Sequence, residues 1–424
     1  MCFGTEMAIV FTNIKITMKK NNIAIIGTVG LPAKYGGFET LTEHLVEELS
    51  DSYDFTVYCS SKKYKNDEKT VNYKGAKLKY LPLDANGIQS IPYDTWSIIH
   101  ALFTNDVLLI LGVAGAWILP FVRLFTNRKI IISIDGIEWR RDKWSLLAKL
   151  YLWWAEKIAV KFSHIDISDN ESIQDYTALR YKTLSRVIEY GADHAVKTSP
   201  TEADFQKHPF LKSEYAVKVC RIEPENNVHL VLQAFKETPN HQLVFVGNWN
   251  NSDYGKNLKY NYENIPNLFL LDPIYDQREI DVIRGNASLY IHGHSAGGTN
   301  PSLVEAMFLG LPIFSYDVSY NKTTTENKAL YFKSIEDLKK LILHTQKEEL
   351  EICAKNLKNV ANRRYTWKKV AEKYHYLIKE ALATKNKTKV EANIKNLNQK
   401  TLSKYRVLHL KNTYLFNEKK NTTH

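Results

Sequence analysis

The chain has 424 residues, of which 44% are apolar and 24% charged. This length and balance exclude a small module, a disordered chain, a collagen-like protein and a coiled coil, and are typical of a globular protein of two or three domains. The net charge of +11 comes mainly from residues 385–424, whose ten Lys or Arg and two acidic residues give +8 and leave +3 for residues 1–384. A nearly balanced body argues against nucleic-acid binding by a basic folded face.

The cysteines and the first residues bear on the cellular compartment. The four cysteines are far apart and form no C-x-x-C pair, so the sequence predicts neither a zinc knuckle nor a disulfide framework and favours a reducing cytoplasm. Residues 1–17 lack the basic and apolar regions of a signal peptide. We expect residues 1–21 to be an extension, with Met18 as an alternative start.

Short apolar runs rich in β-branched residues alternate with helical patterns, which is typical of parallel strands joined by crossover helices. The runs of a first series lie at residues 23–26, 55–58, 78–81, 107–111, 130–134 and 187–189. Those of a second series lie at residues 216–220, 243–246, 268–271, 289–292 and 312–314. Two such series predict an α/β protein with two Rossmann-like domains.

The turn-rich segment Thr198-Ser-Pro-Thr-Glu-Ala-Asp separates the two series. We therefore place the first domain at residues 22–197 and the second at residues 198–366. An amphipathic pattern at residues 367–384 predicts a C-terminal helix, and we expect the basic, Lys/Asn/Thr-rich residues 385–424 to form a flexible tail.

The longest uncharged apolar run, residues 107–122, has sixteen residues, fewer than the roughly 20 that a membrane-spanning helix needs. It divides at Ala114-Gly-Ala into a buried strand and the start of a helix. We therefore expect no membrane span here.

Ligands bind beyond the carboxyl ends of the strands in open parallel sheets, so the loops that follow strands are the candidate sites. The first reads Gly27-Thr-Val-Gly30-Leu-Pro-Ala-Lys-Tyr-Gly36-Gly37-Phe-Glu39-Thr40. Paired glycines before a helix let backbone amides approach a phosphate or a sugar, and a plain tight turn is the alternative. The spacing is not that of the dinucleotide fingerprint, which argues against an NAD enzyme.

The second loop reads Asp135-Gly-Ile-Glu138-Trp139-Arg140-Arg141. Carboxylates beside an arginine pair at the end of a strand suit recognition of a hydroxyl group or stabilisation of charge. A capped turn with a solvated ion pair is the structural alternative.

The third and densest loop reads His292-Gly-His294-Ser-Ala-Gly297-Gly298-Thr299-Asn300-Pro301-Ser-Leu-Val-Glu305. Pro301 suits the first turn of a helix, and the amides before it suit a diphosphate. Glu305, about one turn into that helix, would then reach ribose hydroxyls. Two histidines without a third ligand are a weak metal signal, so we expect neither a metal nor another cofactor.

With these loops, and with Arg221-Ile-Glu-Pro-Glu-Asn226-Asn227 before the third, the sequence resembles glycosyltransferase family 4, whose fold is GT-B. It most resembles the bacterial rhamnosyltransferases of capsule, exopolysaccharide and O-antigen synthesis, over about residues 22–383. The resemblance implies two Rossmann-like domains that face each other across a cleft, with a nucleotide sugar bound by the second and an acceptor by the first.

The resemblance also implies roles for single residues. It places Glu305 on the ribose, Arg221 on the diphosphate, and Asp135 where many relatives carry a catalytic histidine. The predicted catalytic residues are Asp135, Arg221 and Glu39, and the predicted substrate-binding residues are Gly36, Gly37, Glu138, Asn226, His294, Gly297, Gly298, Thr299, Asn300 and Glu305.

Two positions depart from the general family. Gly297 stands where a glutamate, eight residues before Glu305, is credited with holding the sugar, and Asn226 stands where a lysine binds the phosphate. The rhamnosyl-like subgroup shares both changes, which favours a donor other than glucose or mannose. The family is retaining and needs no metal, so the implied reaction is a front-face displacement in which the acceptor hydroxyl attacks as the diphosphate leaves.

The helical pattern at residues 144–161 mixes tryptophans, leucines and lysines, as helices lying in a lipid interface do. An ordinary helix that buries its tryptophans in the first domain is the alternative. The basic tail would add attraction to anionic lipid, about 1 kcal/mol per residue near the surface, or would serve as a solubilising tail.

The sequence therefore predicts a cytoplasmic hexosyltransferase, peripheral on the inner membrane, that moves rhamnose from dTDP-rhamnose onto a lipid-linked saccharide acceptor, with no nucleic-acid partner. A transferase using a UDP-hexose or GDP-mannose, a nucleotide-sugar epimerase, and a non-catalytic GT-B scaffold are the alternatives.

Overall fold

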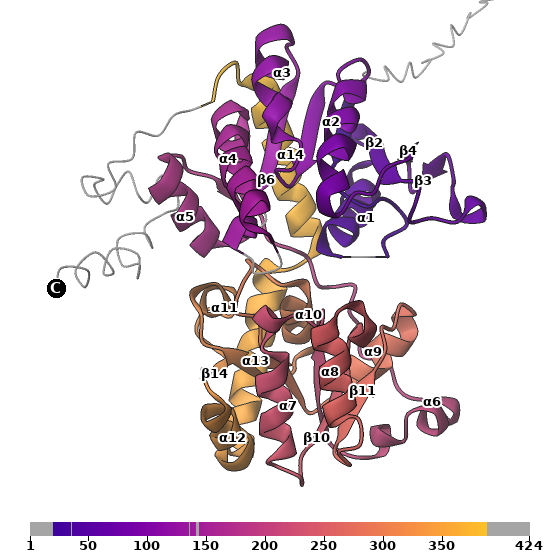
Figure 1. Ribbon diagram of the computed structural model, residues 1–424, viewed down its shortest axis with the longest axis vertical. Coiled ribbons are helices and arrows are strands. Elements are labelled where there is room, and N and C mark those ends of the chain that lie inside the picture. The colour runs from indigo at the N-terminus through magenta and orange to yellow at the C-terminus, as the bar shows by residue number, and fades with distance from the viewer. Residues whose placement is uncertain (1–19, 35, 135, 141–143, 388–424) are drawn as a thin grey trace, which may run out of the picture.

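The computed structural model describes residues 20–34, 36–134, 136–140 and 144–387. These residues form two α/β domains, which lie one above the other in Figure 1. The predicted fold class, two Rossmann-like domains built on parallel sheets, is confirmed.

The first sheet has eight strands, all parallel except the antiparallel pair at one edge, β3 and β4. Across the sheet the strands are β3 (Asn72–Tyr73), β4 (Ala76–Leu81), β2 (Tyr53–Ser60), β1 (Asn21–Ile26), β5 (Val107–Leu111), β6 (Lys129–Ile134), β7 (Ile165–Ser168) and β8 (Arg186–Val187). The helices of this domain are α1 (Gly37–Leu49), α2 (Ser90–Ala101), α3 (Leu119–Phe125), α4 (Leu146–Phe162) and α5 (Glu171–Tyr181), with one-turn 3-10 helices η1 (Asn66–Glu68), η2 (Gly87–Gln89), η3 (Ala116–Ile118) and η4 (Glu138–Arg140).

The second sheet has six parallel strands. Across the sheet they are β11 (Leu268–Leu271), β10 (Gln242–Val246), β9 (Tyr215–Val219), β12 (Leu289–His292), β13 (Ile313–Tyr316) and β14 (Leu330–Phe332). The helices are α6 (Glu202–Lys207), α7 (Val228–Lys236), α8 (Asp253–Tyr262), α9 (Gln277–Gly285), α10 (Pro301–Leu309), α11 (Ser319–Thr324), α12 (Ile335–His344), α13 (Lys347–Arg364) and α14 (Trp367–Ala383), with η5 (Pro209–Lys212), η6 (Pro224–Asn226) and η7 (Trp249–Asn251).

Both faces of the first sheet are covered by helices. Ile23 and Ile25 of β1 join one core cluster with residues of α1 and α14, while Ala24 and Ile26 join another with residues of α2, α3 and α4. Because successive side chains of a strand point to opposite faces, a strand covered on both sides must be apolar throughout. This is why the central strands are readable as continuous apolar runs.

The last helix of the second domain's chain segment crosses back to the first domain. Helix α14 begins at Trp367, just after α13, and packs against α1, β5 and β6, as Figure 1 shows. One core cluster therefore includes Ile25 of the first sheet, Trp367, and Leu303 of α10. A continuous apolar core of this kind holds the two domains in a defined relation.

The apolar run at residues 107–122 folds as predicted into a strand and a helical segment, β5 followed by η3 and α3. Among the described residues, no helix has both the length and the apolar character needed to cross a membrane. Lys387, the last of them, lies 2.5 Å from the carboxylate of the buried Asp166 of β7. Most of the predicted basic tail and of the predicted N-terminal extension, residues 388–424 and 1–19, lies outside the described part of the chain.

A buried carboxyl group in α2 gives the stability of the protein a defined dependence on pH. Asp94 is buried against the loop at Gly115, and burial raises the pKa of its carboxyl to about 8, although the backbone N–H of Gly115 lowers it in part. The unfolded chain ionises near pH 4, so the folded state binds the proton more tightly between these values. Stability from this group is complete below pH 4 and is lost as the pH rises to about 8.

We therefore expect the free energy of unfolding of Asp94→Asn, minus that of the wild type, to be larger at pH 8 than at pH 4. The advantage should grow by about 1.4 kcal/mol per pH unit between these values, since one pKa unit corresponds to that energy. Urea unfolding at several pH values measures it. Asp67→Asn, which makes the same carboxylate-to-amide change at an exposed position, is the control.

Candidate active site

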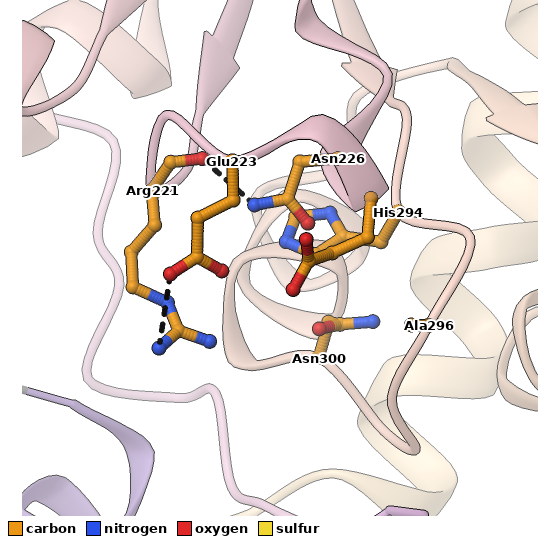
Figure 2. A pocket seen from close by; sticks show the side chains of 7 residues that line it. Arg221, Glu223, Asn226, His294, Ala296 and Asn300 are labelled. Carbon is orange, nitrogen blue, oxygen red and sulfur yellow. Dashed lines mark hydrogen bonds and ion pairs between the residues drawn. The ribbon is translucent and has the colours of Figure 1, made fainter. Parts of the chain in front are cut away.

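A polar pocket lies at the carboxyl end of the second sheet. Its lining residues are Arg221, Glu223, Glu225, Asn226, His294, Ala296 and Asn300, most of which are labelled in Figure 2. Those from 221 to 226 follow β9 and those from 294 to 300 follow β12, its neighbour in the sheet. Four of the predicted site residues, from two separate loops, therefore meet in one pocket.

Hydrogen bonds to backbone carbonyls fix the first of these loops internally and tie it to the second. The side-chain amide of Asn226 donates to the carbonyl of Arg221 at 2.7 Å, and that of Asn227 donates to the carbonyl of Gly293 at 2.8 Å. Both the backbone N–H and the hydroxyl of Ser295 donate to the carbonyl of Glu225 at 2.8 Å. These bonds set the shape of the pocket before any ligand enters it.

Arg221 is the cation of this pocket. Its side chain is 62% exposed, and its guanidinium lies 3.8 Å from the carboxylate of Glu223, a pair that Figure 2 shows at the pocket. An exposed ion pair at this distance is weak, because water screens it. The guanidinium is thus accessible to an anion that enters the pocket.

Helix α10 begins at this pocket. Asn300 is its N-cap residue and Pro301 its first residue, as predicted from the sequence. The first N–H groups of a helix have no partner within the helix and carry partial positive charge. The pocket therefore combines a guanidinium with a helix N-terminus, an arrangement that favours phosphate groups.

The loop before α10 also touches the first domain. The hydroxyl of Thr299 donates to the backbone carbonyl of Asp169 at 2.6 Å, and the N–H of Thr299 donates to the Asp169 carboxylate at 3.1 Å. Both groups of Thr299 are thus engaged by the first domain. Thr299 acts here as a link between domains, a contact that the loop motif did not reveal.

All three predicted loops come together at this boundary. A β-carbon on Gly37 would lie 3.1 Å from Cγ of Pro301, and one on Gly136 would lie 3.3 Å from Cα of Gly297. Gly297 itself has φ of +131°, a backbone conformation that favours glycine. Glycines on both sides thus let the loops of the two domains approach closely.

Glu305 lies in α10 with its two carboxylate oxygens engaged by partners from two other segments. One oxygen accepts from Nε2 of His194 at 3.0 Å, and the other pairs with Arg284 of α9. Burial alone would raise the pKa of this carboxyl, but the charge of Arg284 and the His194 bond outweigh it and lower the pKa to about 2. The carboxylate is therefore ionised, and Glu305 is not among the residues that line the polar pocket.

The ring of His194 is oriented by the first residue of α14. Nε1–H of Trp367 donates to Nδ1 of His194 at 2.9 Å. An indole N–H is only a donor, so Nδ1 of His194 is an acceptor and its Nε2 carries the proton that goes to Glu305. The helix that crosses back to the first domain thus positions the carboxylate of the second.

Three other predicted residues lie elsewhere. The Glu39 carboxylate is buried and accepts from the N–H of Val29 at 2.6 Å and from the hydroxyl of Thr28 at 3.1 Å, so it holds its own loop together. Gly36 is the N-cap residue of α1. Glu138 lies in η4 and accepts from Nε1–H of Trp144 at 3.0 Å. Asp135 lies outside the described residues, so its role stays a prediction.

The two histidines of the third loop stack on each other. The ring centroids of His292 and His294 are 4.4 Å apart, with an interplanar angle of 13°. Burial lowers the pKa of His292 well below its usual range. In the part of the chain that the structure describes, no three His, Cys, Asp or Glu side chains form a group suited to a metal ion.

Comparisons with known proteins agree with this architecture. Residues 200–364 match the family model Glycosyl transferases group 1, and residues 20–193 match a domain of unknown function, DUF1972. The fold is GT-B, and the second domain matches the group 1 glycosyl transferases, a match that indicates glycosyl transfer from a nucleotide sugar. No curated protein sequence matches the chain.

Solved structures share the fold at low sequence identity. Sucrose-phosphate synthase from Thermosynechococcus elongatus is 14% identical with a TM-score of 0.72, over 86% of this chain and all of that one. HepE from Anabaena, in complex with UDP-glucose, is 14% identical with a TM-score of 0.65, over 85% of this chain and 99% of that one. A glycosyltransferase from Rickettsia africae is 13% identical with a TM-score of 0.65, over 87% of this chain and all of that one.

Proposed function

We propose that this protein is a retaining glycosyltransferase that moves a hexosyl group, rhamnose from dTDP-rhamnose, onto a lipid-linked saccharide in bacterial surface polysaccharide synthesis. The observation that carries the proposal is the polar pocket itself. Arg221 and the N-terminus of α10 suit a diphosphate, and the ionised Glu305 lies in that same helix for the ribose.

In the proposed reaction the acceptor hydroxyl attacks the sugar as the diphosphate leaves on the same face. The charge that grows on the leaving diphosphate needs donors already in place. Arg221 and the N–H of Ser302 in the first turn of α10 are the candidates, because Pro301 has no N–H and those of Leu303 and Val304 donate to the carbonyl of Asn300. The diphosphate accepts the proton of the acceptor. The first domain would present the acceptor from the side of Gly36, Gly37 and Asp135.

Rhamnose is favoured by the two departures from the wider family, Gly297 and Asn226. A UDP-hexose is the second candidate, because HepE, a structural neighbour, was solved in complex with UDP-glucose. The two donors differ at the ribose, since dTDP has one free ribose hydroxyl for Glu305 and UDP has two. Comparing dTDP-linked with UDP-linked donors therefore also tests the contact of Glu305 with the ribose.

Nucleotide release from purified full-length protein tests the proposal. The donors are dTDP-rhamnose, UDP-glucose, UDP-galactose, UDP-N-acetylglucosamine and GDP-mannose, each with a lipid-linked saccharide acceptor and with chelator present. We expect release from dTDP-rhamnose. Release from another donor only would replace rhamnose as the proposed sugar. Formation of an epimer without acceptor would indicate an epimerase. No binding of any donor would favour a non-catalytic scaffold.

We expect Arg221→Ala to weaken dTDP binding about tenfold or more, because a hydrogen bond to a charged group contributes about 1.5–3 kcal/mol. The melting temperature should stay within about 1 °C of the wild type, since the Arg221 side chain is 62% exposed and its guanidinium lies as far as 3.8 Å from Glu223. Calorimetry measures the affinity. Lys256→Ala removes a comparably exposed partner of Asp253, also at 3.8 Å, and should leave binding unchanged.

We further propose that the first domain contacts the cytoplasmic face of the membrane. Large apolar side chains are exposed on α2, α3 and α4 and in the segments beside them. They are Trp96, Ile99, Phe103, Trp117, Phe121, Leu124, Phe125, Leu146, Leu147, Leu150, Trp153 and Trp154. Nε1–H of Trp117 donates to Thr95 of α2, and α4 packs against η3 and α3, so these elements are adjacent.

This surface has the composition of a lipid-binding face. Trp153 and Trp154 are each 44% exposed, so α4 does not bury its tryptophans in the core. Lys157 and Lys161 are exposed on the same helix. Aromatic and leucine side chains next to lysines favour an interface with anionic lipid.

Sedimentation with vesicles tests this contact. We expect the protein to bind vesicles that contain phosphatidylglycerol, and the triple variant Leu146→Ser, Leu147→Ser, Leu150→Ser to bind several-fold less. The matched control, Leu343→Ser with Ile352→Ser, removes exposed apolar side chains from the second domain and should bind as the wild type does. Equal binding by both variants would contradict the assignment.

A further inference from the structure

Strand β9 carries a lysine inside the second domain. Lys218 is fully buried, and among the described residues its Nζ has no hydrogen-bond partner. Nζ of Lys218 lies 5.6 Å from the centroid of the Phe245 ring. Burial lowers the pKa of this amine. A buried polar group without a partner is unfavourable for folding, so its presence in a core strand calls for a function.

The amine lies behind the wall of the polar pocket. A β-carbon on Gly293 would lie 2.7 Å from Nζ of Lys218 and 2.5 Å from the carbonyl oxygen of Asn226. Gly293 directly precedes His294, and both Asn226 and His294 line the pocket. Gly293, which has no side chain, is therefore close both to the amine and to Asn226 of the pocket lining.

The pocket needs more positive charge than its own lining provides. The lining contains one guanidinium, Arg221, and two carboxylates, Glu223 and Glu225. A nucleoside diphosphate would bring at least two further negative charges. In a partly enclosed site such charges interact strongly, because the effective dielectric constant is lower than in water. Asn226, which also lines the pocket, adds no charge.

We propose that Lys218 is the second cation of the diphosphate site and that it takes up a proton when the diphosphate binds. The proton comes from the solvent, the amine becomes an ammonium, and no covalent bond forms or breaks. The ammonium then stabilises the phosphate charge from behind Gly293. This inference rests on the proposed function, because it requires a nucleotide in the pocket.

Other titratable groups lie near Lys218, and their proton uptake must be distinguished from that of its amine. Cys220 and His292 interact electrostatically with the amine. Glu223, Glu225 and His294 line the pocket and would also bind protons more tightly beside a diphosphate. Proton uptake must therefore be compared between the wild type and a variant that lacks only the amine.

Calorimetry of dTDP binding to the full-length protein in PIPES and in Tris buffer, which differ in ionisation enthalpy, measures the protons exchanged. We expect the wild type to take up protons when the nucleotide binds, because binding a diphosphate raises the pKa of a nearby amine. We expect Lys218→Met to lose this uptake and to bind dTDP at least tenfold more weakly. The same variant should melt at a higher temperature, since it replaces an unpartnered polar group by an apolar one. A merely structural lysine would not give this combination.

The outcomes separate the two proposals. Lys259→Met, which removes a lysine paired with Asp272 away from the pocket, should leave affinity and proton uptake unchanged. Wild-type binding without proton uptake, or equal affinity and uptake in Lys218→Met, would overturn the role of Lys218 and leave the proposed function intact. Failure of the wild type to bind dTDP, UDP or GDP would overturn the proposed function, and this inference with it.

Discussion

Replacing Glu305 by alanine is expected to weaken both the fold and the donor site. Arg284 is almost completely buried, and of the residues that the structure describes only Asp281 would remain as its charged partner. Removing one member of a buried ion pair typically destabilises by about 3–5 kcal/mol. The ribose would lose a charge-assisted hydrogen bond, which contributes about 1.5–3 kcal/mol, so dTDP affinity should fall about 10-fold to 100-fold.

Glu305→Gln separates these two effects. The amide keeps the shape of the side chain and one acceptor oxygen but removes the charge, so part of the ion-pair energy is lost while the packing of α10 is retained. Urea unfolding gives the stability, and calorimetry well below the melting temperature gives the affinity. Glu279 is the matched control, because its carboxylate also pairs with a histidine, His208, and a cation, Lys207, away from the pocket. Unchanged dTDP affinity in a folded Glu305→Gln protein would remove Glu305 from the ribose site.

The partners of Glu305 illustrate the limit of prediction from the sequence. Its place in a helix one turn after a proline was readable from adjacent residues. Arg284 and His194 contact its carboxylate, and Trp367 orients the ring of His194. These three residues come from segments far apart in the chain. No local spacing connects them, because only tertiary folding brings α14 back to the first domain.

The strands also divide into those that the sequence predicts and those that it does not. The central strands were predictable because both faces of each sheet are covered, so their sequences are continuously apolar. Strand β7 was missed, since Ile165–Ser168 includes Asp166, whose buried carboxylate is neutralised by Lys387 more than two hundred residues later. A pattern of apolar residues does not indicate a strand that contains a buried charged side chain whose partner lies so far along the chain.

Lys218 is the residue that sequence analysis could have found. A charged side chain in the middle of an otherwise apolar strand run, Tyr215–Val219, is unusual for a sheet covered on both faces. The run is predicted as a strand, and Lys218 is the one charged residue within it. Thr299 had no such signal, because the bonds that engage it belong to Asp169 in the other domain.

Replacing Gly298 by alanine is expected to open the contact between the domains. An added β-carbon would lie 2.0 Å from Oδ1 of Asp169, far closer than any real contact. Asp169 cannot turn aside freely, since its other carboxylate oxygen and its backbone carbonyl both accept from Thr299. The loop that begins α10 must therefore move relative to the first domain. A displacement of about 1 Å at a reacting centre can lower the rate about 100-fold, so we expect kcat for transfer to fall by that order while dTDP affinity, set within the second domain, changes less.

Asp169→Ala supplies the test of this steric cause. The single variant loses the hydrogen bond to the N–H of Thr299 but leaves Gly298 free of any clash, so its rate should fall only modestly. The double variant Asp169→Ala, Gly298→Ala should then transfer about as fast as Asp169→Ala alone, because the oxygen that the new β-carbon would strike is gone. Steady-state rates of the four proteins form a double-mutant cycle, and a large coupling between the two sites is the expected result. Additive losses would mean that Gly298 acts on the donor rather than through the first domain, and a wild-type rate in Gly298→Ala would show that transfer does not depend on this contact.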